Sequence, residues 1–207
     1  MPQRKVGQGE TTSSLAKKNG FFWKTIWEHG ENSDLRSKRK DPNVLYSSDD
    51  IFIPERELKK VSKGTEQEHV FKRKGEPTKI KMQLLELGKP RANEDYVLEV
   101  AGKLVNGKTD GDGKLEHFIP GDAKSGKLIF KAGKEVHGLR LGSLDPLDVV
   151  DGVQQRLDNL GFKVGGEKGK LGTKTKAALK KFQAEYELDQ SGDADDATKA
   201  KLEELAK

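Results

Sequence analysis

The sequence predicts an α+β protein of several small modules: a strand–helix–helix–strand unit, a small antiparallel β-sandwich and a C-terminal three-helix bundle. The composition is one reason, because 32% hydrophobic and 35% charged residues in a chain of 207 suit several small cores better than one large core. The hydrophobic pattern also changes, from mixed in residues 6–54 to alternating in 69–141 and helical in 148–206. Between the first two patterns, residues 55–68 are charged and poor in large apolar groups. We therefore place modules at 1–55, 69–143 and 144–207, with a linker at 56–68.

The first module contains two predicted helices between two short strands. The hydroxyls of residues 11–14 are N-cap groups for a helix that Gly20 ends. A second helix carries Phe22, Trp23, Ile26 and Trp27 on one face, a spacing more typical of core packing than of a sugar-stacking platform. Residues 50–54 form a strand bounded by proline, and Val6 lies near its partner strand.

This order and these residues resemble the lysin motif, a small carbohydrate-binding module. The family opens with V-x-x-G-D-T-L-x-x-I-A and closes with N-P-x-x-L-x-x-G-x-x-I-x-I-P; residues 6–16 read VGQGETTSSLA and residues 41–54 read DPNVLYSSDDIFIP. Ser48 replaces the usual glycine, and residues 33–40 are an insertion. The resemblance implies a glycan groove between two loops, formed by Gly9, Glu10, Thr11, Thr12, Pro42, Asn43, Val44 and Leu45. The alternative for these residues is helix capping and a turn.

The middle module is predicted to be a β-sandwich. Its apolar residues alternate at Ile80, Met82 and Leu84, at Tyr96, Leu98 and Val100, at Leu128 and Phe130, and at Val136, Leu139 and Leu141, with a break at Gly138. Residues 90–98 and 107–115 are similar to the transthyretin-like, carboxypeptidase-regulatory sandwiches. Residues 110–113 favour a hairpin turn over a calcium loop, because Lys114 and Gly121 stand where calcium requires oxygen ligands.

The last module is predicted to contain three short helices, which must pack together to be stable. Val150, Val153, Leu157 and Leu160 share one helix face, and Gly161 ends that helix. Thr173 is the predicted N-cap of the next helix, whose apolar face contains Ala178, Leu179, Phe182 and Tyr186. Asp195 or Asp196 caps a third helix that carries Leu202 and Leu205.

This module resembles the helical peptidoglycan-binding domain, whose pattern is V-Q-x-x-L-x-x-L-G-Y, then G-x-F-G-x-x-T-x-x-A-V-x-x-F-Q, then L-x-x-D-G and T-x-x-x-L. Residues 153–162 read VQQRLDNLGF, residues 169–183 read GKLGTKTKAALKKFQ, and the match continues through 188–192 and 198–202. The resemblance implies peptidoglycan as partner, with Leu171, Gly172, Thr175 and Gln183 as candidate contacts. Gln183 either ties down a loop or faces a ligand, and the sequence leaves both open.

Several kinds of chemistry are disfavoured. The chain has no cysteine, and its four histidines lack metal-ligand spacing, so we expect no metal and no cofactor. A glycosidase pair drawn from Glu10, Glu28 and Glu31 with Asp49 or Asp50 would require a fixed cleft, which small binding modules rarely build. We expect no catalytic residues and no enzymatic activity.

Charge and targeting signals define the expected partners. The net charge is +5, and the basic run at residues 36–40 is interpreted as a solvated loop, so we expect no nucleic-acid partner. No apolar run approaches the roughly 18 residues of a membrane span, and the first ten residues lack an apolar export segment. We therefore expect no membrane insertion, and synthesis in the cytoplasm without a signal peptide.

The pairing of the two modules suggests a biological setting. Chains with a lysin-motif-like front and this helical end resemble accessory proteins encoded beside contractile injection systems, including type VI secretion systems. The resemblance implies contact with a spike, hub or baseplate protein, and delivery to the periplasm or to a target cell. The expected function is non-catalytic peptidoglycan binding as such an accessory. The alternative is a structural adaptor whose modules bind protein, with the sandwich as docking surface.

Overall fold

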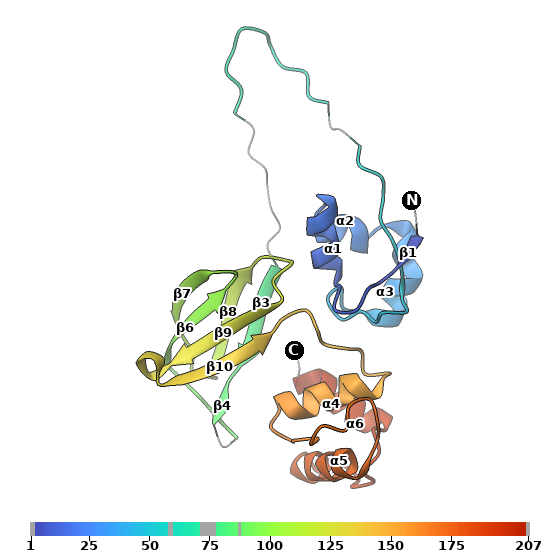
Figure 1. Cartoon of the computed structure of the whole chain (residues 1–207), viewed down its shortest axis with the longest axis vertical. Coiled ribbons are helices and arrows are strands. Elements are labelled where there is room, and N and C mark those ends of the chain that lie inside the picture. The colour runs from blue at the N-terminus through green and yellow to red at the C-terminus, as the bar shows by residue number, and fades with distance from the viewer. Residues whose placement is uncertain (1–2, 58–59, 71–77, 87, 206–207) are drawn as a thin grey trace.

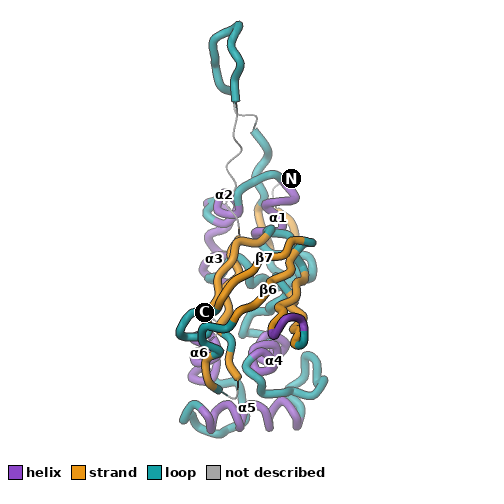
Figure 2. Tube along the Cα trace, turned by 90° about the vertical axis from the view of Figure 1, so that its left-hand side faces the viewer, coloured by secondary structure: helices purple, strands orange, loops and turns teal. Residues whose placement is uncertain are grey.

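The computed structural model describes residues 3–57, 60–70, 78–86 and 88–205, and it is an α+β structure with helices at both ends and small antiparallel sheets between them (Figures 1 and 2). Buried apolar side chains form three clusters, drawn from residues 6–51, 80–141 and 153–202. We call the surrounding regions the N-terminal unit (residues 3–54), the β unit (residues 78–141) and the helical unit (residues 145–205).

The N-terminal unit has one more helix than predicted. Its elements are β1 (Gln3–Lys5), α1 (Thr12–Asn19), α2 (Trp23–Trp27), the short turn η1 (Gly30–Asn32), α3 (Ser33–Arg39) and β2 (Asp50–Phe52), with β1 antiparallel to β2. Thr11 caps α1 by accepting from the Ser14 amide, and Gly20 ends the helix with a φ of 74°. The predicted insertion at residues 33–40 contains α3, so the basic run is helical and not a loop.

The tryptophans of α2 have different surroundings. Trp27 is 8% exposed and lies in the apolar cluster, whereas Trp23 is partly buried at its margin. Phe22 is 41% exposed, so it does not share the buried face with them. It occupies the N-cap position of α2 and has an extended backbone, so its side chain does not follow the spacing of the helical residues.

The β unit contains two main sheets that share one apolar cluster. One sheet has the order β10-β9-β6-β7, formed by β6 (Asp95–Val100), β7 (Lys103–Lys108), β9 (Ser125–Phe130) and β10 (Glu135–Arg140). The other pairs β3 (Thr78–Gln83) with β8 (Lys114–Ile119), and β4 (Leu85–Glu86) pairs with β5 (Lys89–Pro90). Leu98 and Phe130 from the first sheet pack in the same cluster as Ile80 and Leu115 from the second.

Two predictions for the β unit were wrong in detail. Gly138 does not interrupt its strand, because it lies within β10 opposite Lys127 and its peptide continues the ladder. Residues 110–113 do form a tight turn, in which the Asp110 carboxylate accepts from the amides of Asp112 and Lys114 at 2.9 and 2.7 Å. The turn is not a hairpin, because β7 pairs with β6 whereas β8 pairs with β3.

The helical unit contains α4 (Val150–Asn159), α5 (Thr173–Glu185) and α6 (Asp196–Leu205), whose side chains meet in one cluster around Leu157, Leu179, Phe182 and Leu202. Asp195 caps α6 by accepting from the Thr198 amide at 2.8 Å.

Thr173 does not cap α5. Instead the carboxylate of Glu167, from the preceding loop, accepts from the amides of Lys174 and Thr175 at 3.1 and 2.8 Å. These two amide hydrogen bonds hold the pKa of Glu167 below its ordinary value.

Residues 55–57 and 60–70 form neither helix nor strand and lie in the long excursion between the N-terminal and β units (Figure 1). Within the described ranges of the chain, no helix is long and apolar enough to cross a membrane.

Candidate binding sites

The two loops of the predicted glycan groove lie side by side. The amide of Thr12 donates to the carbonyl of Pro42 at 3.0 Å, which joins residues 9–12 to residues 42–45. Thr12 and Leu45 are 0% and 6% exposed, so these two side chains belong to the interior. Gly9, Glu10, Pro42, Asn43 and Val44 are partly buried at the edge of the unit, while Thr11 is 4% exposed.

Most polar groups of the first loop are already bonded within the chain. The Glu10 carboxylate accepts from the Gly7 amide at 2.8 Å and pairs with Arg4. The hydroxyl of Thr11 accepts from the amide of Ser14 at 3.1 Å. Thr11 is therefore a helix cap, as the alternative predicted, whereas Glu10 closes the turn that begins at Gly7.

Three buried oxygens in this part of the N-terminal unit, two of them on predicted groove residues, have no such partner. The hydroxyls of Thr12 and Ser13 and the amide oxygen of Asn43 accept or donate no hydrogen bond among the described residues. Only one other buried side-chain atom of the described chain, Nε of Arg156, shares this property. Thr12 and Asn43 belong to the predicted groove, whereas Ser13 lies against Gly121 of the β unit, where an added Cβ would be 3.3 Å from the Cβ of Ser13. Asn43 is the partly exposed residue of the three.

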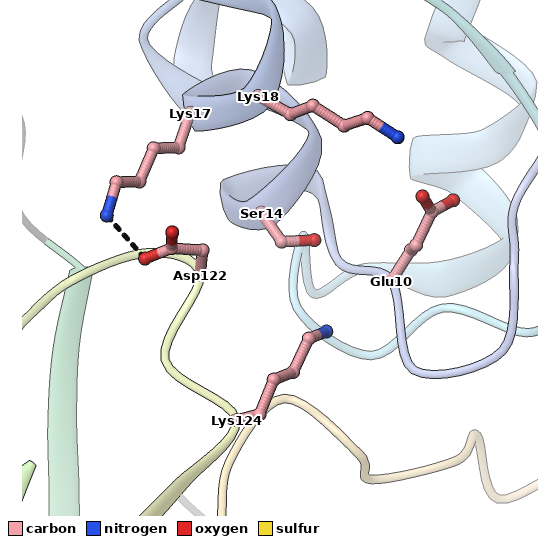
Figure 3. A pocket seen from close by; sticks show the side chains of 6 residues that line it. All are labelled: Glu10, Ser14, Lys17, Lys18, Asp122 and Lys124. Carbon is pink, nitrogen blue, oxygen red and sulfur yellow. Dashed lines mark hydrogen bonds and ion pairs between the residues drawn. The ribbon is translucent and has the colours of Figure 1, made fainter. Parts of the chain in front are cut away.

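The first loop also contacts the β unit. Lys124 donates to the carbonyl of Gly9, and Lys17 forms an ion pair with Asp122. Gly142 lies so close to Thr11 that an added Cβ would be 3.1 Å from the threonine methyl group. Between the N-terminal and β units lies a pocket of about 430 Å³. Its lining residues, drawn in Figure 3, are Glu10, Ser14, Lys17, Lys18, Asp122 and Lys124.

The two arginines of the basic run in α3 form hydrogen bonds within the chain. Arg36 donates to the carbonyls of Trp27 and His29 at 2.6 and 2.7 Å. Arg39 is 8% exposed; its Nε and Nη2 donate to Asp49 at 2.6 and 2.8 Å, and its Nη1 donates to both oxygens of Asp148. The interpretation of this run as a solvated loop was therefore wrong, because residues 36–39 are helical and both guanidinium groups are bonded to acceptors within the chain, of which Asp49 is buried.

The carboxylates considered for glycosidase chemistry are held apart by separate partners. Asp49 is bonded to Arg39 in the interior, and Asp50 pairs with Lys5 at 2.7 Å on the surface. Glu28 and Glu31 are exposed on the helical side of the same unit. The described structure brings no two of these groups into direct contact.

Gln183 ties down a loop. It is fully buried, and its Nε2 donates to the carbonyl of Asp193 at 2.9 Å and to the hydroxyls of Ser191 and Thr198 at 3.2 and 3.0 Å. Its Oε1 accepts from the amide of Gly192 at 2.9 Å. All polar atoms of this side chain are thus engaged within the chain.

Gln154, on the preceding helix, has the same role, which we did not predict from the sequence. It donates to the carbonyls of Glu167 and Lys170 and to the Thr175 hydroxyl, and it accepts from the Gly169 amide at 2.9 Å. The signal was present as a repeat: a glutamine after an apolar residue, then a glycine, then a threonine in the first turn of the next helix. Thr175 is consequently 0% exposed and bonded to this glutamine.

Leu171 and Gly172 are the partly exposed members of the predicted helical site. They lie at the start of α5, where an added Cβ on Gly172 would be 2.6 Å from the Glu167 carboxyl carbon. The close approach of Glu167 explains the glycine. Of the four candidates, these two face the surface.

Comparison with known proteins identifies this end of the chain. Residues 148–202 match the family model of the putative peptidoglycan binding domain. This supports a peptidoglycan-binding helical domain. The matched range includes Gln154, Gln183 and both loops that they hold. No curated protein matches the chain.

A solved structure with partial likeness is the crystal structure of a periplasmic domain of the EpsAB fusion protein of the Vibrio vulnificus type II secretion system. It is 13% identical, with a TM-score of 0.27, and the match covers 62% of this chain. The chain spans 64% of that structure's length. A likeness this low carries no argument about fold or function.

Proposed function

We propose that this protein binds peptidoglycan without cleaving it, through the helical unit and through a lysin-motif-like N-terminal unit. The observation that carries the proposal is the match of residues 148–202 to the putative peptidoglycan binding domain. The three helices of that segment form one packed core, as a three-helix bundle would. We propose that the N-terminal unit binds the glycan chain, and that the N-terminal and helical units together attach the protein to the wall.

The unpartnered amide oxygen of Asn43, on a partly exposed residue of the second loop, supports the role of the N-terminal unit. Cell-wall sugars offer hydroxyl and N-acetyl groups that donate and accept hydrogen bonds. A sugar beside the second loop could donate to the Asn43 oxygen and remove the penalty of leaving it unpaired, whereas the Thr12 and Ser13 hydroxyls lie in the interior. Because each module is small, two in one chain raise the effective concentration of the second after the first has bound.

Sedimentation with purified sacculi tests this function. We expect the full-length chain to sediment with sacculi at 0.15 M salt and to release no soluble fragments from them. An Asn43→Ala variant should bind sacculi more weakly, whereas Asn106→Ala, at an exposed position of β7, should bind like the wild type. Absence of sedimentation would refute peptidoglycan binding, and released muropeptides would refute the non-catalytic assignment.

A second candidate function is that of an adaptor for the spike or baseplate of a contractile injection system, which would deliver the chain to the periplasm or a target cell. One observation favours it: the edge strand β7 exposes Leu104 at 68% and Val105 at 38%, and neither end of the sheet order is paired further among the described strands. Such an edge accepts a strand from another chain. Co-purification of the tagged chain with spike and hub proteins from its native host tests it, and recovery of the chain alone would refute it.

A further inference from the structure

The helical unit has an uneven distribution of charge. Residues 163–181 contain seven lysines and a single acidic residue, Glu167. The lysines are Lys163, Lys168, Lys170, Lys174, Lys176, Lys180 and Lys181, and all are exposed. Over residues 145–205 as a whole, 13 acidic residues outnumber 10 basic ones, so this concentration is not visible in the net charge.

The positive charge of this segment is not neutralised locally. The carboxylate of Glu167 is directed to the amides of Lys174 and Thr175 at the start of α5. Lys176 forms an ion pair with Asp193 at 3.7 Å. The other six ammonium groups form no ion pair with any residue that the structure describes, in contrast to Arg36 and Arg39, whose guanidinium groups are bonded in the interior.

Five of these lysines lie on one side of α5 or on the loop that precedes it. Lys174 and Lys181 are seven residues apart and so lie on the same side of α5. The side chain of Lys174 extends over the preceding loop, because an added Cβ on Gly165 would be 2.6 Å from its Cδ. That loop supplies Lys163, Lys168 and Lys170. We call Lys163, Lys168, Lys170, Lys174 and Lys181 the lysine surface.

Lys176 and Lys180 are left out of this surface for a structural reason. Lys180 lies over Gly192, where an added Cβ would be 2.9 Å from its Cε, and Lys176 faces Asp193. Both therefore lie beside the acidic loop before α6. Two acids lie beside the lysine surface: Glu167, whose carboxylate accepts from the Lys174 amide, and Asp151, whose Oδ2 would be 3.0 Å from a Cβ on Gly169.

The lysine surface is accessible to a large partner. In both Figure 1 and Figure 2, α5 lies at the end of the molecule away from the N-terminal unit. The loop before α5 is held by Gln154, which donates to the carbonyl of Lys170 at 2.9 Å and accepts from the Gly169 amide. The backbone that carries the loop lysines is therefore held in place by Gln154.

The residue types indicate which anion fits. Residues 163–181 contain no arginine, so they lack the planar fork that binds a phosphate at two points. They also contain no aromatic residue on which a nucleic-acid base would stack. Lysines are hydrated point charges on flexible stems, which suit dispersed monovalent anions. Peptidoglycan carries such anions as the free carboxylates of its stem peptides.

We propose that the lysine surface binds the free carboxylates of peptidoglycan stem peptides, so that the helical unit recognises the peptide component of the wall by charge. The inference rests on the proposed function. Each exposed charge pair contributes little by itself, and five acting together on a repeating polymer are required for a measurable effect.

The test compares two charge-matched variants of the full chain on two kinds of sacculi. In the first variant, Lys163, Lys168, Lys170, Lys174 and Lys181 are replaced by Gln. In the control, Lys60, Lys63, Lys89, Lys103 and Lys134, which are exposed and form no ion pair with a described residue, are replaced in the same way. Each protein is sedimented with untreated sacculi and with sacculi whose carboxylates have been amidated.

We expect the first variant to bind untreated sacculi about tenfold more weakly than the wild type, which corresponds to about 1.4 kcal/mol, and the control to stay within twofold. Amidation should weaken the wild type to the level of the first variant. Raising the salt from 0.1 M to 1 M should have the same effect, because the screening length falls from about 10 to about 3 Å.

The possible failures are distinct. If the wild type does not sediment with untreated sacculi, the proposed function fails. If it sediments but neither the variant nor amidation weakens it, only the assignment of the lysine surface fails. Tight binding of duplex DNA that is lost in the first variant, without a loss on sacculi, would assign the surface to nucleic acid and also overturn the inference.

Discussion

Asp49 and Arg39 form a buried ion pair in the N-terminal unit, with side chains 1% and 3% exposed. The Asp49 carboxylate accepts from Nε and Nη2 of Arg39, from the Tyr46 amide at 2.8 Å and from Lys38 at 3.2 Å. We expect Asp49→Asn to lower the free energy of unfolding of this unit by about 3 kcal/mol, because a buried guanidinium would lose the charge that compensates it.

The geometry sets this magnitude. Each oxygen of Asp49 accepts from one Arg39 nitrogen and one further donor, so an amide NH2 in either place would face two donors. Breaking a buried pair by removing one partner destabilises by about 3–5 kcal/mol. The lower end applies here because Arg39 keeps its contacts of 2.8 and 2.9 Å with Asp148.

Urea unfolding followed by tryptophan fluorescence measures the effect. The chain has two tryptophans, Trp23 and Trp27, and both lie in the N-terminal unit, so the signal reports that unit alone. With a denaturant slope of roughly 1 kcal/mol/M for so small a unit, the midpoint should fall by about 3 M. The matched control is Asp50→Asn, whose side chain is 55% exposed and pairs with Lys5, and it should change stability by less than about 0.5 kcal/mol.

The pH dependence gives a second readout. Burial acts to raise the pKa of Asp49, but hydrogen bonds from Arg39, Tyr46 and Lys38 outweigh it, so the pKa lies below its ordinary value. The stability from this carboxylate is therefore fully present above the unfolded pKa of about 3.9 and is lost as the pH falls further, through the folded pKa. The difference in free energy of unfolding between the wild type and Asp49→Asn should shrink below about pH 4. A gap under about 0.5 kcal/mol at pH 7, or one that persists unchanged in acid, would refute the reasoning.

Further predictions concern the other units. Gln183→Leu should lower the free energy of unfolding of the helical unit by about 2–4 kcal/mol, because it leaves the buried partners of Gln183 unpaired. The rate of amide hydrogen exchange in α5 and α6 should then rise. The control Gln190→Leu, at an exposed position, should leave that rate unchanged. Asp122→Asn combined with Asp148→Asn removes two contacts of the N-terminal unit with the rest of the chain and should increase the radius of gyration in small-angle scattering, with an unchanged radius as the contrary result. Limited proteolysis should cut first within residues 55–68, and a resistant fragment that spans them would show the first two modules to be one domain.

Local rules of sequence account for much of the secondary structure. The N-cap at Thr11 and the C-terminal glycine at Gly20 define α1 in the structure as they did in the sequence. In the helical unit, the spacing of Val153 and Leu157 places both in the core. These features depend on neighbours within one or two helical turns, which the sequence displays directly.

Other elements were not predicted correctly from the sequence, because their sequence signals are weak or depend on residues far away in the chain. Strand β7 shows no buried alternation, since Leu104 and Val105 are both exposed, and its place is set by pairing with β6. The turn after it looked like a hairpin because turn residues define the bend but not the partner strands. Thr173 was a reasonable cap by residue type, but Glu167 reaches the same amides with a charged group.

The sequence by itself determined the caps of α1, the apolar helix faces and the family resemblance of residues 148–202, because each depends on residues close together along the chain. The tertiary structure alone decided what the charged and polar side chains do. Arg39 is a buried link and not part of a solvated loop because Asp148, 109 positions away, lies beside it. Gln183 holds a loop because Gly192 and Thr198 fold over it. Electrostatic and hydrogen-bond partners are set by distance in space, and the order of residues does not specify that distance until the chain has folded.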